Sequence, residues 1–319
     1  MVDFNQQYGE KSMDNVIVTG AYGFLGKGLV EELSRVSKKV YAIVRRQSDI
    51  IKFPENVSVV ACDLSESAEL LSDILPKGSD AWYHLAWEGS YGEKRADLVI
   101  QLKNIEMSKK CFEIASDIKC KKFIGMGTIS EYLIINDAEK GRQLNSPGQL
   151  YAISKDYTNM LLRTMSRTLD IDFIWCRLSN IYSSDLSIGN IISYEIRELI
   201  NGRIPQFSKG EQPYNFIYIK DCMNALLCIG SGICKHEEYF IGGIEQYQLK
   251  DYLMMVNEYI DPKIKIGIGE RGEDGLQYSR KWFDITSLKE DFSFVPKYSF
   301  EEGMKECAKI IKIGRDDIK

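Results

Sequence analysis

The sequence predicts an α/β fold, with a doubly wound parallel sheet followed by a smaller C-terminal domain. In the first half of the chain, short apolar runs alternate with segments of helical periodicity. The first run leads into a turn with three glycines at intervals of three residues, and a helical pattern follows that turn. Strands that alternate with helices form right-handed crossovers, which produce a parallel sheet covered by helices on both faces.

Seven apolar runs have the length and the β-branched or aromatic content of strands. They cover residues 15–19, 39–44, 57–61, 81–86, 122–127, 172–177 and 239–243. We therefore expect a doubly wound domain over residues 13–185. Residues 186–319 should form mainly a smaller cap with a helix near 188–201, and segments near 213–243 should return to the sheet.

Composition favours a small-molecule partner over nucleic acid or a membrane. The 319 residues are 44% hydrophobic and 27% charged, with a net charge of -5 and no block of like charges. No apolar run approaches the ~18 residues of a membrane span. The polar N-terminus lacks the apolar core of a signal peptide. We expect a cytoplasmic protein with a disordered first dozen residues.

Cysteine and histidine usage argues against a metal site. The eight cysteines include no Cys-x-x-Cys pair, and the two histidines, His84 and His236, are far apart in the sequence. Zinc sites usually draw on closely spaced pairs of such ligands. Scattered cysteines with apolar neighbours are typical of buried side chains in a reducing cytoplasm.

The segment VIVTGAYGFLGKGLVEEL predicts a site for a dinucleotide pyrophosphate. It joins a strand, a tight turn and a helix, with Gly20, Gly23 and Gly26 in the turn. Glycine permits a positive φ and removes Cβ atoms from the path of an anion, which the N-terminus of the helix attracts. The alternative is a tight turn that binds no anion, but the strand before it and the helix after it favour the dinucleotide.

The second predicted strand ends in Val44, followed by Arg45 and Arg46. Chains that bind NAD usually have a carboxylate here, which binds the ribose 2'-hydroxyl. A 2'-phosphate instead favours guanidinium groups and no carboxylate. The pattern therefore predicts NADP as the cofactor. The alternative is a pair of surface arginines beside NAD.

Two Tyr-x-x-x-Lys sequences occur, but only one lies on an unbroken helical pattern. Tyr151 and Lys155 lie one turn apart on one face of that pattern, whereas the pair Tyr259 and Lys263 encloses Pro262, which breaks a helix. A lysine cation ~4 Å from a phenol, at an effective dielectric of ~20, would lower the pKa of the phenol by about three units before desolvation. We therefore expect Tyr151 to exchange a proton with the substrate near neutral pH. The alternative is an exposed surface pair.

Further motifs resemble those of the extended short-chain dehydrogenase/reductase family of nucleotide-sugar epimerases, dehydratases and reductases. They are Asp63-Leu64, HLAW at 84–87, Asn104, Thr128, YAISK at 151–155, RLSNIY at 177–182 and the segment FSKGEQPYNFIYIKD. Together with the GxxGxxG turn they cover nearly the whole chain from Asn15 onward. The resemblance implies a Rossmann domain that binds NAD(P) and a C-terminal domain that binds the substrate.

The resemblance also implies roles for individual residues. Thr128 and Tyr151 would share the reacting oxygen of the substrate, and Lys155 would act in catalysis and also bind the nicotinamide ribose. The cofactor-binding residues would be Gly20, Tyr22, Gly23, Phe24, Leu25, Gly26, Arg45, Arg46, Asp63, Leu64, Leu85, Ala86 and Lys155. The substrate-binding residues would be Trp87, Asn180, Tyr214 and Arg271.

Some of these residues have simpler alternative roles. Thr128 could be a turn cap, and Asp63 could be the N-cap of a helix expected in DLSESAELL. We interpret His84 as a support for the edge of the sheet, in preference to a catalytic residue.

Two departures from the family pattern bear on the reaction. Family dehydratases follow the threonine with Asp-Glu, whereas this chain has Ile129 and Ser130, which disfavours dehydration. Many members have an arginine in the later substrate segment, where this chain has Tyr214-Asn215-Phe216, and this weakens the case for a nucleoside diphosphate.

The sequence thus predicts NADPH-dependent reduction of a 4-keto or 4-keto-6-deoxy sugar nucleotide. One alternative is an epimerase that keeps its NAD(P) bound. Another is a sensor or scaffold that binds the dinucleotide without chemistry. The chain could also form a homodimer.

Overall fold

The computed structural model describes residues 13–48, 51–140, 148–272 and 278–316. The first dozen residues, for which the sequence predicts disorder, lie outside this part of the chain. The chain forms two compact units. Unit 1 comprises Met1–Arg177, Met223–Tyr239 and Thr286–Phe294, and unit 2 comprises Leu178–Cys222, Phe240–Ile285 and Val295–Lys319.

The main sheet has seven strands in the order β10-β6-β5-β4-β1-β2-β3. They are β1 (Met13–Thr19), β2 (Ser37–Val44), β3 (Val57–Ala61), β4 (Ala81–His84), β5 (Lys122–Thr128), β6 (Asp172–Leu178) and β10 (Glu238–Ile241). The pairs that join β3, β2, β1, β4 and β5 are parallel. The strand order reverses between β1 and β4, which is the place where open α/β sheets bind their ligands. All seven predicted strands are present, and the predicted fold is confirmed.

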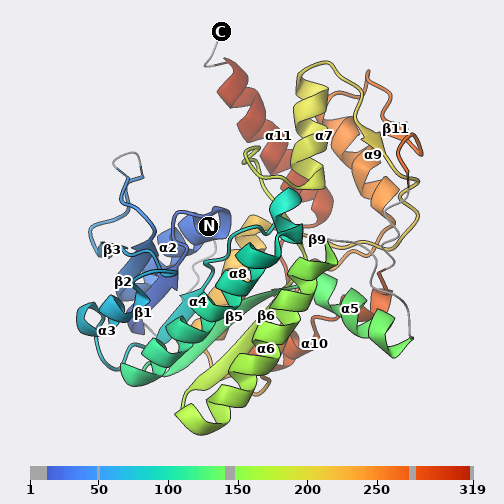
Figure 1. Ribbon diagram of the computed structural model, residues 1–319. Coiled ribbons are helices and arrows are strands. Elements are labelled where there is room, and N and C mark those ends of the chain that lie inside the picture. The colour runs from blue at the N-terminus through green and yellow to red at the C-terminus, as the bar shows by residue number, and fades with distance from the viewer. Residues whose placement is uncertain (1–12, 49–50, 141–147, 273–277, 317–319) are drawn as a thin grey trace. The chain divides into compact units, whose positions relative to one another are not determined.

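Helices cover both faces of this sheet (Figure 1). They are α2 (Phe24–Val36), α3 (Leu71–Ile74), α4 (Leu98–Asp117), α6 (Gln149–Leu169), α8 (Ile219–Ser231) and α10 (Thr286–Phe292), with the short 3-10 helices η1 (Ala68–Leu70) and η2 (Glu93–Ala96). α5 (Ser130–Glu139) packs against α6 at the side of the sheet. On one face, Trp82 and Phe123 pack into a core with Phe112 of α4. On the other face, the hydroxyl of Tyr83 donates to the Leu226 carbonyl of α8 at 3.2 Å. Successive residues of β4 therefore face opposite layers, as the pleat of a strand requires.

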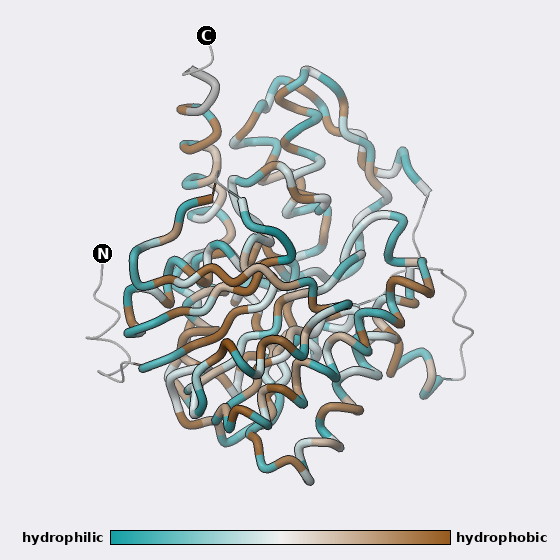
Figure 2. Tube along the Cα trace, turned by 60° about the vertical axis from the view of Figure 1, so that its left-hand side comes forward, coloured by the Kyte–Doolittle hydropathy of each residue, from teal (hydrophilic) through white to brown (hydrophobic). Residues whose placement is uncertain are grey.

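The sequence explains where several helices begin and end. α2 buries Leu29, Val30 and Leu33 on one stripe, and Figure 2 shows such alternation of hydrophobic and hydrophilic residues along the helices. The N-cap of α4 is Asp97, whose carboxylate accepts from Ile100 N at 3.1 Å. The C-cap of α6 is Asp170, which has a left-handed φ of 49°.

The helix expected in DLSESAELL is shorter than the sequence suggests. It starts only at Ala68 with η1 and continues as α3. Asp63 is therefore not its N-cap. The Asp63 carboxylate instead accepts from Ser65 N at 3.0 Å and from Ser65 Oγ at 2.6 Å, which forms a local turn.

Unit 2 has its own core of aromatic and aliphatic side chains. Its elements are α7 (Ile191–Ile200), α9 (Leu249–Ile260), α11 (Phe300–Asp316), β7 (Asn180–Tyr182), β8 (Gln206–Phe207), β9 (Phe216–Tyr218), β11 (Gly267–Ile268) and η3 (Arg280–Trp282). Tyr182, Phe216 and Tyr252 are buried together in its centre. The helix predicted near 188–201 is present as α7. Among the described residues, no helix is both long enough and apolar enough to span a bilayer.

Candidate active site

The glycine turn follows β1 and leads into α2. Gly20 has a φ of +73°, and a Cβ at this position would lie 2.8 Å from the backbone nitrogen of Ala86. Only glycine fits such a turn without moving the loop after β4. Gly23 is the N-cap of α2, and no side chain caps the first turn. The N–H groups of that turn can therefore receive an anion.

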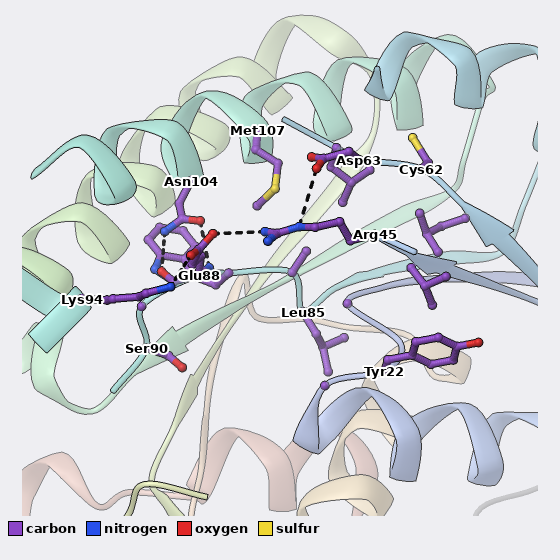
Figure 3. Close-up of a pocket in the computed structure, with 18 of the residues that line it drawn as sticks. Tyr22, Arg45, Cys62, Asp63, Leu85, Glu88, Ser90, Lys94, Asn104 and Met107 are labelled. Carbon is purple, nitrogen blue, oxygen red and sulfur yellow. Dashed lines mark hydrogen bonds and ion pairs between the residues drawn. The ribbon is translucent and has the colours of Figure 1, made fainter. Parts of the chain in front are cut away.

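A pocket of about 590 Å³ lies in unit 1 beside this turn (Figure 3). Of the predicted cofactor and substrate residues, those that line it are Gly20, Tyr22, Gly23, Arg45, Asp63, Leu64, Leu85, Ala86 and Trp87. Phe24, Leu25, Gly26, Arg46 and Lys155 are not among the described residues that line it. Most of the lining comes from the carboxyl ends of neighbouring parallel strands and the loops that follow them, and the rest from Lys94 of η2 and from Asn104 and Met107 of α4.

Charged side chains cross one end of the pocket. Arg45 Nη2 lies 3.2 Å from Glu88 Oε2, and Arg45 Nε lies 3.7 Å from Asp63 Oδ2. Lys94 Nζ lies 2.7 Å from the other oxygen of Glu88. The pKa of Glu88 is lowered, chiefly by the hydrogen bond from Lys94. Burial, the next largest influence, raises it, and Arg45 lowers it further. The sequence predicted Arg45 here but not the two residues Glu88 and Lys94.

Two buried amides of α4 hold the loop that carries these charges. Asn104 donates to the Glu88 carbonyl at 2.7 Å and accepts from Glu88 N at 2.9 Å. Gln101 donates to the carbonyls of Gly89 and Lys94 and accepts from Trp87 Nε1 at 3.0 Å. The loop after β4 is therefore fixed by side chains of the next helix. Asn104 is one of the family landmarks in the sequence, and these bonds give it a structural role.

Thr128, Tyr151 and Lys155 come from β5 and α6. Lys155 is buried, its Nζ donates to the Met126 carbonyl at 2.7 Å, and it lies 5.9 Å from the centre of the Tyr151 ring. Nζ also lies 3.7 Å from the centre of the Trp87 ring, which meets the Tyr151 ring edge-on at 6.2 Å. Trp87 lines the pocket, so its indole connects this cluster with the pocket.

Burial dominates the ionisation of Tyr151 and Lys155. It raises the pKa of Tyr151 to about 12, although the charge of Arg95 and a hydrogen bond with Thr128 lower it. Burial also lowers the pKa of Lys155 to about 7, against an opposing effect of Glu131. The expectation that Lys155 brings the phenol close to neutral titration is wrong for this structure. The reason is that desolvation, which the sequence argument left aside, outweighs the attraction between the charges.

Arg95 of η2 is a cation that the sequence analysis did not single out. Its guanidinium carbon lies 4.7 Å from the centre of the Tyr151 ring. Its Nε is buried and has no hydrogen-bond partner in the described part of the chain. Arg95 is the largest influence that lowers the pKa of Tyr151. No local pattern could have indicated it, because its loop meets α6 only in the folded chain.

Glu131 supports Thr128 from the first turn of α5. The carboxylate is fully buried and accepts from Thr128 N at 2.6 Å, from Trp175 Nε1 at 3.0 Å and from Arg177 Nε at 2.8 Å. Burial raises the pKa of Glu131 to about 7, while Arg177 and these hydrogen bonds lower it. Glu131 was not among the predicted site residues, although its position three residues after Thr128 was a usable signal. Thr128 Oγ1 also accepts from Ser130 N at 3.3 Å, so the alternative role as a turn cap is present as well.

His84 is a structural residue at the end of β4. Its ring lies between Thr19 Oγ1 at 2.8 Å and Ser108 Oγ at 3.0 Å. Burial lowers the pKa of His84 to about 3, so the ring is neutral at physiological pH. These contacts support the interpretation of His84 as a support for the sheet edge.

The remaining predicted substrate residues belong to unit 2. Tyr214 donates to Asn180 Oδ1 at 3.2 Å, and Asn180 donates to the Asn215 carbonyl, so these residues form one polar group. Arg271 is exposed and lies in a separate segment, where its backbone N–H donates to the Phe207 carbonyl at 2.9 Å. Within the described ranges, no cluster of His, Cys, Asp and Glu could hold a metal ion.

The protein is a Rossmann-type α/β protein. This class is defined by the parallel sheet, by the glycine turn after β1 and by the pocket over the strand ends. The chain belongs to the NAD dependent epimerase/dehydratase family, whose sequence model matches residues 16–242. The family prediction is thereby confirmed, and the chain is an enzyme of this class.

Individual relatives differ in the reaction that their names state. The chain is 28% identical over 306 residues to the CDP-abequose synthase of Salmonella typhimurium, with 92% of this chain and 97% of that protein covered. Its fold is similar to a UDP-N-acetylglucosamine 4-epimerase from Methanobrevibacter ruminantium, with a TM-score of 0.78, 24% identity and coverage of 95% and 99%. It is also similar to a Bacillus cereus UDP-glucuronic acid 4-epimerase in complex with NAD, with a TM-score of 0.74, 20% identity and coverage of 93% and 96%.

Proposed function

We propose that the protein is an NADPH-dependent reductase of a keto sugar nucleotide, with a 4-keto-6-deoxy sugar as substrate. The observation that carries the proposal is the environment of Tyr151. Its phenol is buried, is hydrogen-bonded with Thr128 and has a pKa raised to about 12 by burial, so it is protonated at neutral pH. Reduction of a carbonyl needs a proton donor at the oxygen, and a protonated phenol is that donor.

The step performed by the chain itself is a proton transfer. NADPH, when bound, would supply the hydride that forms the new C–H bond at the carbonyl carbon. Tyr151 would give its proton to the carbonyl oxygen as the C=O π bond breaks, while the Thr128 hydroxyl holds the same oxygen. Arg95 lies over the Tyr151 ring, and its positive charge stabilises the resulting phenolate until solvent returns a proton. Lys155, whose pKa is about 7, adds to this effect when it is protonated.

NADP as the cofactor is supported by the end of β2. Val44 is buried there, so no carboxylate occupies the usual position of the ribose ligand. Arg45 and Arg46 are both exposed beside the pocket end of the strand, where guanidinium groups bind a phosphate well. The turn at Gly20 and the uncapped start of α2 fit a pyrophosphate. Against this, the Bacillus cereus epimerase of similar fold is in complex with NAD.

The substrate class is supported by the relatives and by the missing dehydratase pair. CDP-abequose synthase is a relative that aligns along almost its whole length. Ile129 and Ser130 follow Thr128, and neither has a side chain that could carry the acid and base steps of water elimination. We assign cofactor binding to residues 13–185 and substrate binding mainly to 186–319, where Asn180 lies just before the boundary and Tyr214 and Arg271 lie within the second segment.

The proposal is tested by mixing the purified protein with NADPH and 4-keto-6-deoxy sugars on several nucleotide bases. Absorbance of the reduced nicotinamide is followed together with product analysis. Oxidation of one NADPH per alcohol formed, with a single stereoisomer as product, is the expected result. Loss of the keto sugar without oxidation of NADPH would contradict the reductase.

A 4-epimerase is the second candidate, because similar folds include the 4-epimerases from Methanobrevibacter ruminantium and Bacillus cereus. An epimerase first removes a proton from a hydroxyl, and this requires a phenolate. The raised pKa of Tyr151 disfavours that form at neutral pH, whereas the second half of an epimerisation, the return of the hydride to the keto intermediate, would use the protonated phenol as a reductase does. Conversion of a plain sugar nucleotide into its epimer, with no added NADPH and no net change in cofactor, would establish the epimerase in place of the reductase.

The cellular setting and assembly state are part of the same proposal. The eight cysteines are free thiols, and seven of them are buried, which suits a reducing cytoplasm. The neighbouring helices α4 and α6 expose Leu102, Tyr157 and Met160. Burial of these side chains against a second copy would support a homodimer, and light scattering of a Leu102→Glu, Met160→Glu variant against the wild type would test it.

A further inference from the structure

Arg45 lies between two carboxylates. Asp63 follows β3 and Glu88 follows β4, and both lie within ion-pair distance of its guanidinium, at 3.7 Å and 3.2 Å. Figure 3 shows the side chains of Arg45 and Glu88 pointing toward each other across the pocket. In the sheet, β1 lies between β2 and β4, so this contact spans the strand that ends in the glycine turn. The ion pair therefore crosses the path expected for a dinucleotide.

Hydrogen bonds from α4 fix the backbone of Glu88. Its backbone N–H and carbonyl are both bound by the Asn104 side chain, which is 4% exposed. Lys94 lies in η2, which follows this loop, and Gln101 binds the carbonyls of Lys94 and Gly89. The carboxylate of Glu88 is thus presented to Arg45 from a fixed backbone, and Lys94 binds its other oxygen at 2.7 Å.

We propose that Glu88 is a specificity residue that competes with the 2'-phosphate of the dinucleotide for Arg45. The inference rests on the proposed function, which takes Arg45 as the ligand of that phosphate. A carboxylate and a phosphate both bind the N–H groups of a guanidinium, so a carboxylate that already holds Arg45 opposes the binding of a phosphate there. Glu88 also repels a bound phosphate through its own charge. NAD has no 2'-phosphate and does not enter this competition.

Lys94 has the opposite effect from Glu88. When Arg45 binds the phosphate, the Glu88 carboxylate can retain its ion pair with Lys94, which lowers the electrostatic cost of the exchange. Lys94 also adds a positive charge at this end of the pocket. At this end of the pocket the carboxylates of Asp63 and Glu88 face the cations Arg45 and Lys94, and Arg46 adds positive charge near Asp63. Removing Glu88 or Lys94 should therefore change the affinity for NADP in opposite directions.

The test measures binding of NADP+ and NAD+ by titration calorimetry at low ionic strength, with no substrate. Glu88→Gln should bind NADP+ about fivefold more tightly than the wild type, which is the size of one partly exposed ion pair, and NAD+ equally well. Lys94→Met should bind NADP+ a few-fold more weakly. Glu93→Gln is the matched control, because Glu93 is an exposed carboxylate of the same loop and does not belong to this ion-pair group. It should leave the ratio of the two affinities unchanged.

A double-mutant cycle shows whether the effect passes through Arg45. In an Arg45→Ala background, Glu88→Gln should lose most of its effect on NADP+. An unchanged NADP+ affinity in Glu88→Gln, or the same gain in Glu93→Gln, would overturn the inference. The wild-type preference tests the proposed cofactor separately. If the wild type binds both dinucleotides equally and Glu88→Gln prefers NADP+, the competition stands and the proposed NADPH preference fails.

Discussion

Two groups of ionisable residues in unit 1, one around Arg45 and one around Tyr151, differ in their exposure to solvent. This difference determines which physical effect dominates in each group. At the end of β2, the side chain of Arg45 is 60% exposed and that of Lys94 is 62% exposed. Beside Trp87, Lys155 is 5% exposed and Tyr151 is 9% exposed. Trp87 lines the pocket and lies under the Lys155 ammonium, so it belongs to both regions.

The comparison shows that similar side chains act through different physical effects. Exposed charges interact in a high dielectric and are screened by salt, so they adjust affinity by modest factors. Buried groups lose hydration, which favours their neutral forms. Burial therefore raises the pKa of Tyr151 to about 12 and lowers the pKa of Lys155 to about 7. We therefore expect the exposed region to select the cofactor and the buried region to control the chemistry.

The largest effect should come from the buried phenol. Tyr151→Phe removes the proton donor while the ring keeps its contacts, so kcat should fall at least about a hundredfold and the NADPH affinity should stay within about twofold. Single-turnover kinetics with a keto sugar nucleotide, together with a binding titration, would measure both. The control is Tyr157→Phe, because Tyr157 lies on the same helix and is 50% exposed. A wild-type rate in Tyr151→Phe would show that another group gives the proton.

A smaller effect is expected at the exposed arginines. Arg45→Ala, Arg46→Ala should weaken NADPH binding about tenfold, because solvent screening and the Glu88 carboxylate reduce the net gain from the phosphate contacts to about 1.4 kcal/mol in total. NADH binding should change by less than about twofold. Arg35→Ala is the control, because Arg35 lies on α2 and is 65% exposed. Equal losses for NADPH and NADH would show that the two arginines do not bind a 2'-phosphate.

The buried lysine should make stability depend on pH. Its pKa is about 7 in the folded protein and 10.5 ordinarily, so between these values the unfolded chain binds more protons than the folded chain. The free energy of unfolding should therefore rise as pH increases through this window, by up to about 1.4 kcal/mol per pH unit, and Lys155→Met should lose that slope. Urea denaturation at pH 7, 8 and 9 would measure it. Lys103→Met, on the exposed face of α4, should keep the wild-type slope, and a flat wild-type curve would contradict the burial of a neutral amine.

The smallest effect concerns salt. Raising the ionic strength from ~0.01 M to ~0.15 M shortens the screening length from about 30 Å to about 8 Å. NADPH should then bind a few-fold more weakly. The pH that gives half-maximal turnover should stay nearly the same, because Tyr151 is only 9% exposed and salt screens buried charges much less than exposed ones. If salt shifted that pH as strongly as it weakened NADPH binding, the exposed and buried regions would not differ in their response to screening.

Much of the fold could be predicted from the sequence because its signals are local. Each predicted strand is a run of apolar residues, and each became a strand of the main sheet. The helix that carries Tyr151 and Lys155 follows from its periodicity, and Pro262 correctly indicated that α9 ends before the second Tyr-x-x-x-Lys pair is complete. The predicted start of the helix after Asp63 was wrong, because the hydrogen bonds from Ser65 to the Asp63 carboxylate form a turn before the helix begins.

The sequence alone determined the strands, the glycine turn, the placement of two arginines after β2 and the spacing of Tyr151 and Lys155 on one helix face. These are properties of neighbouring residues, whose backbone geometry follows from their own side chains. Only the tertiary structure placed Glu88 against Arg45, Arg95 over Tyr151 and Glu131 against Arg177. It also reversed the expected ionisation of Tyr151, because desolvation depends on everything that surrounds a group, and most of those atoms come from distant parts of the chain.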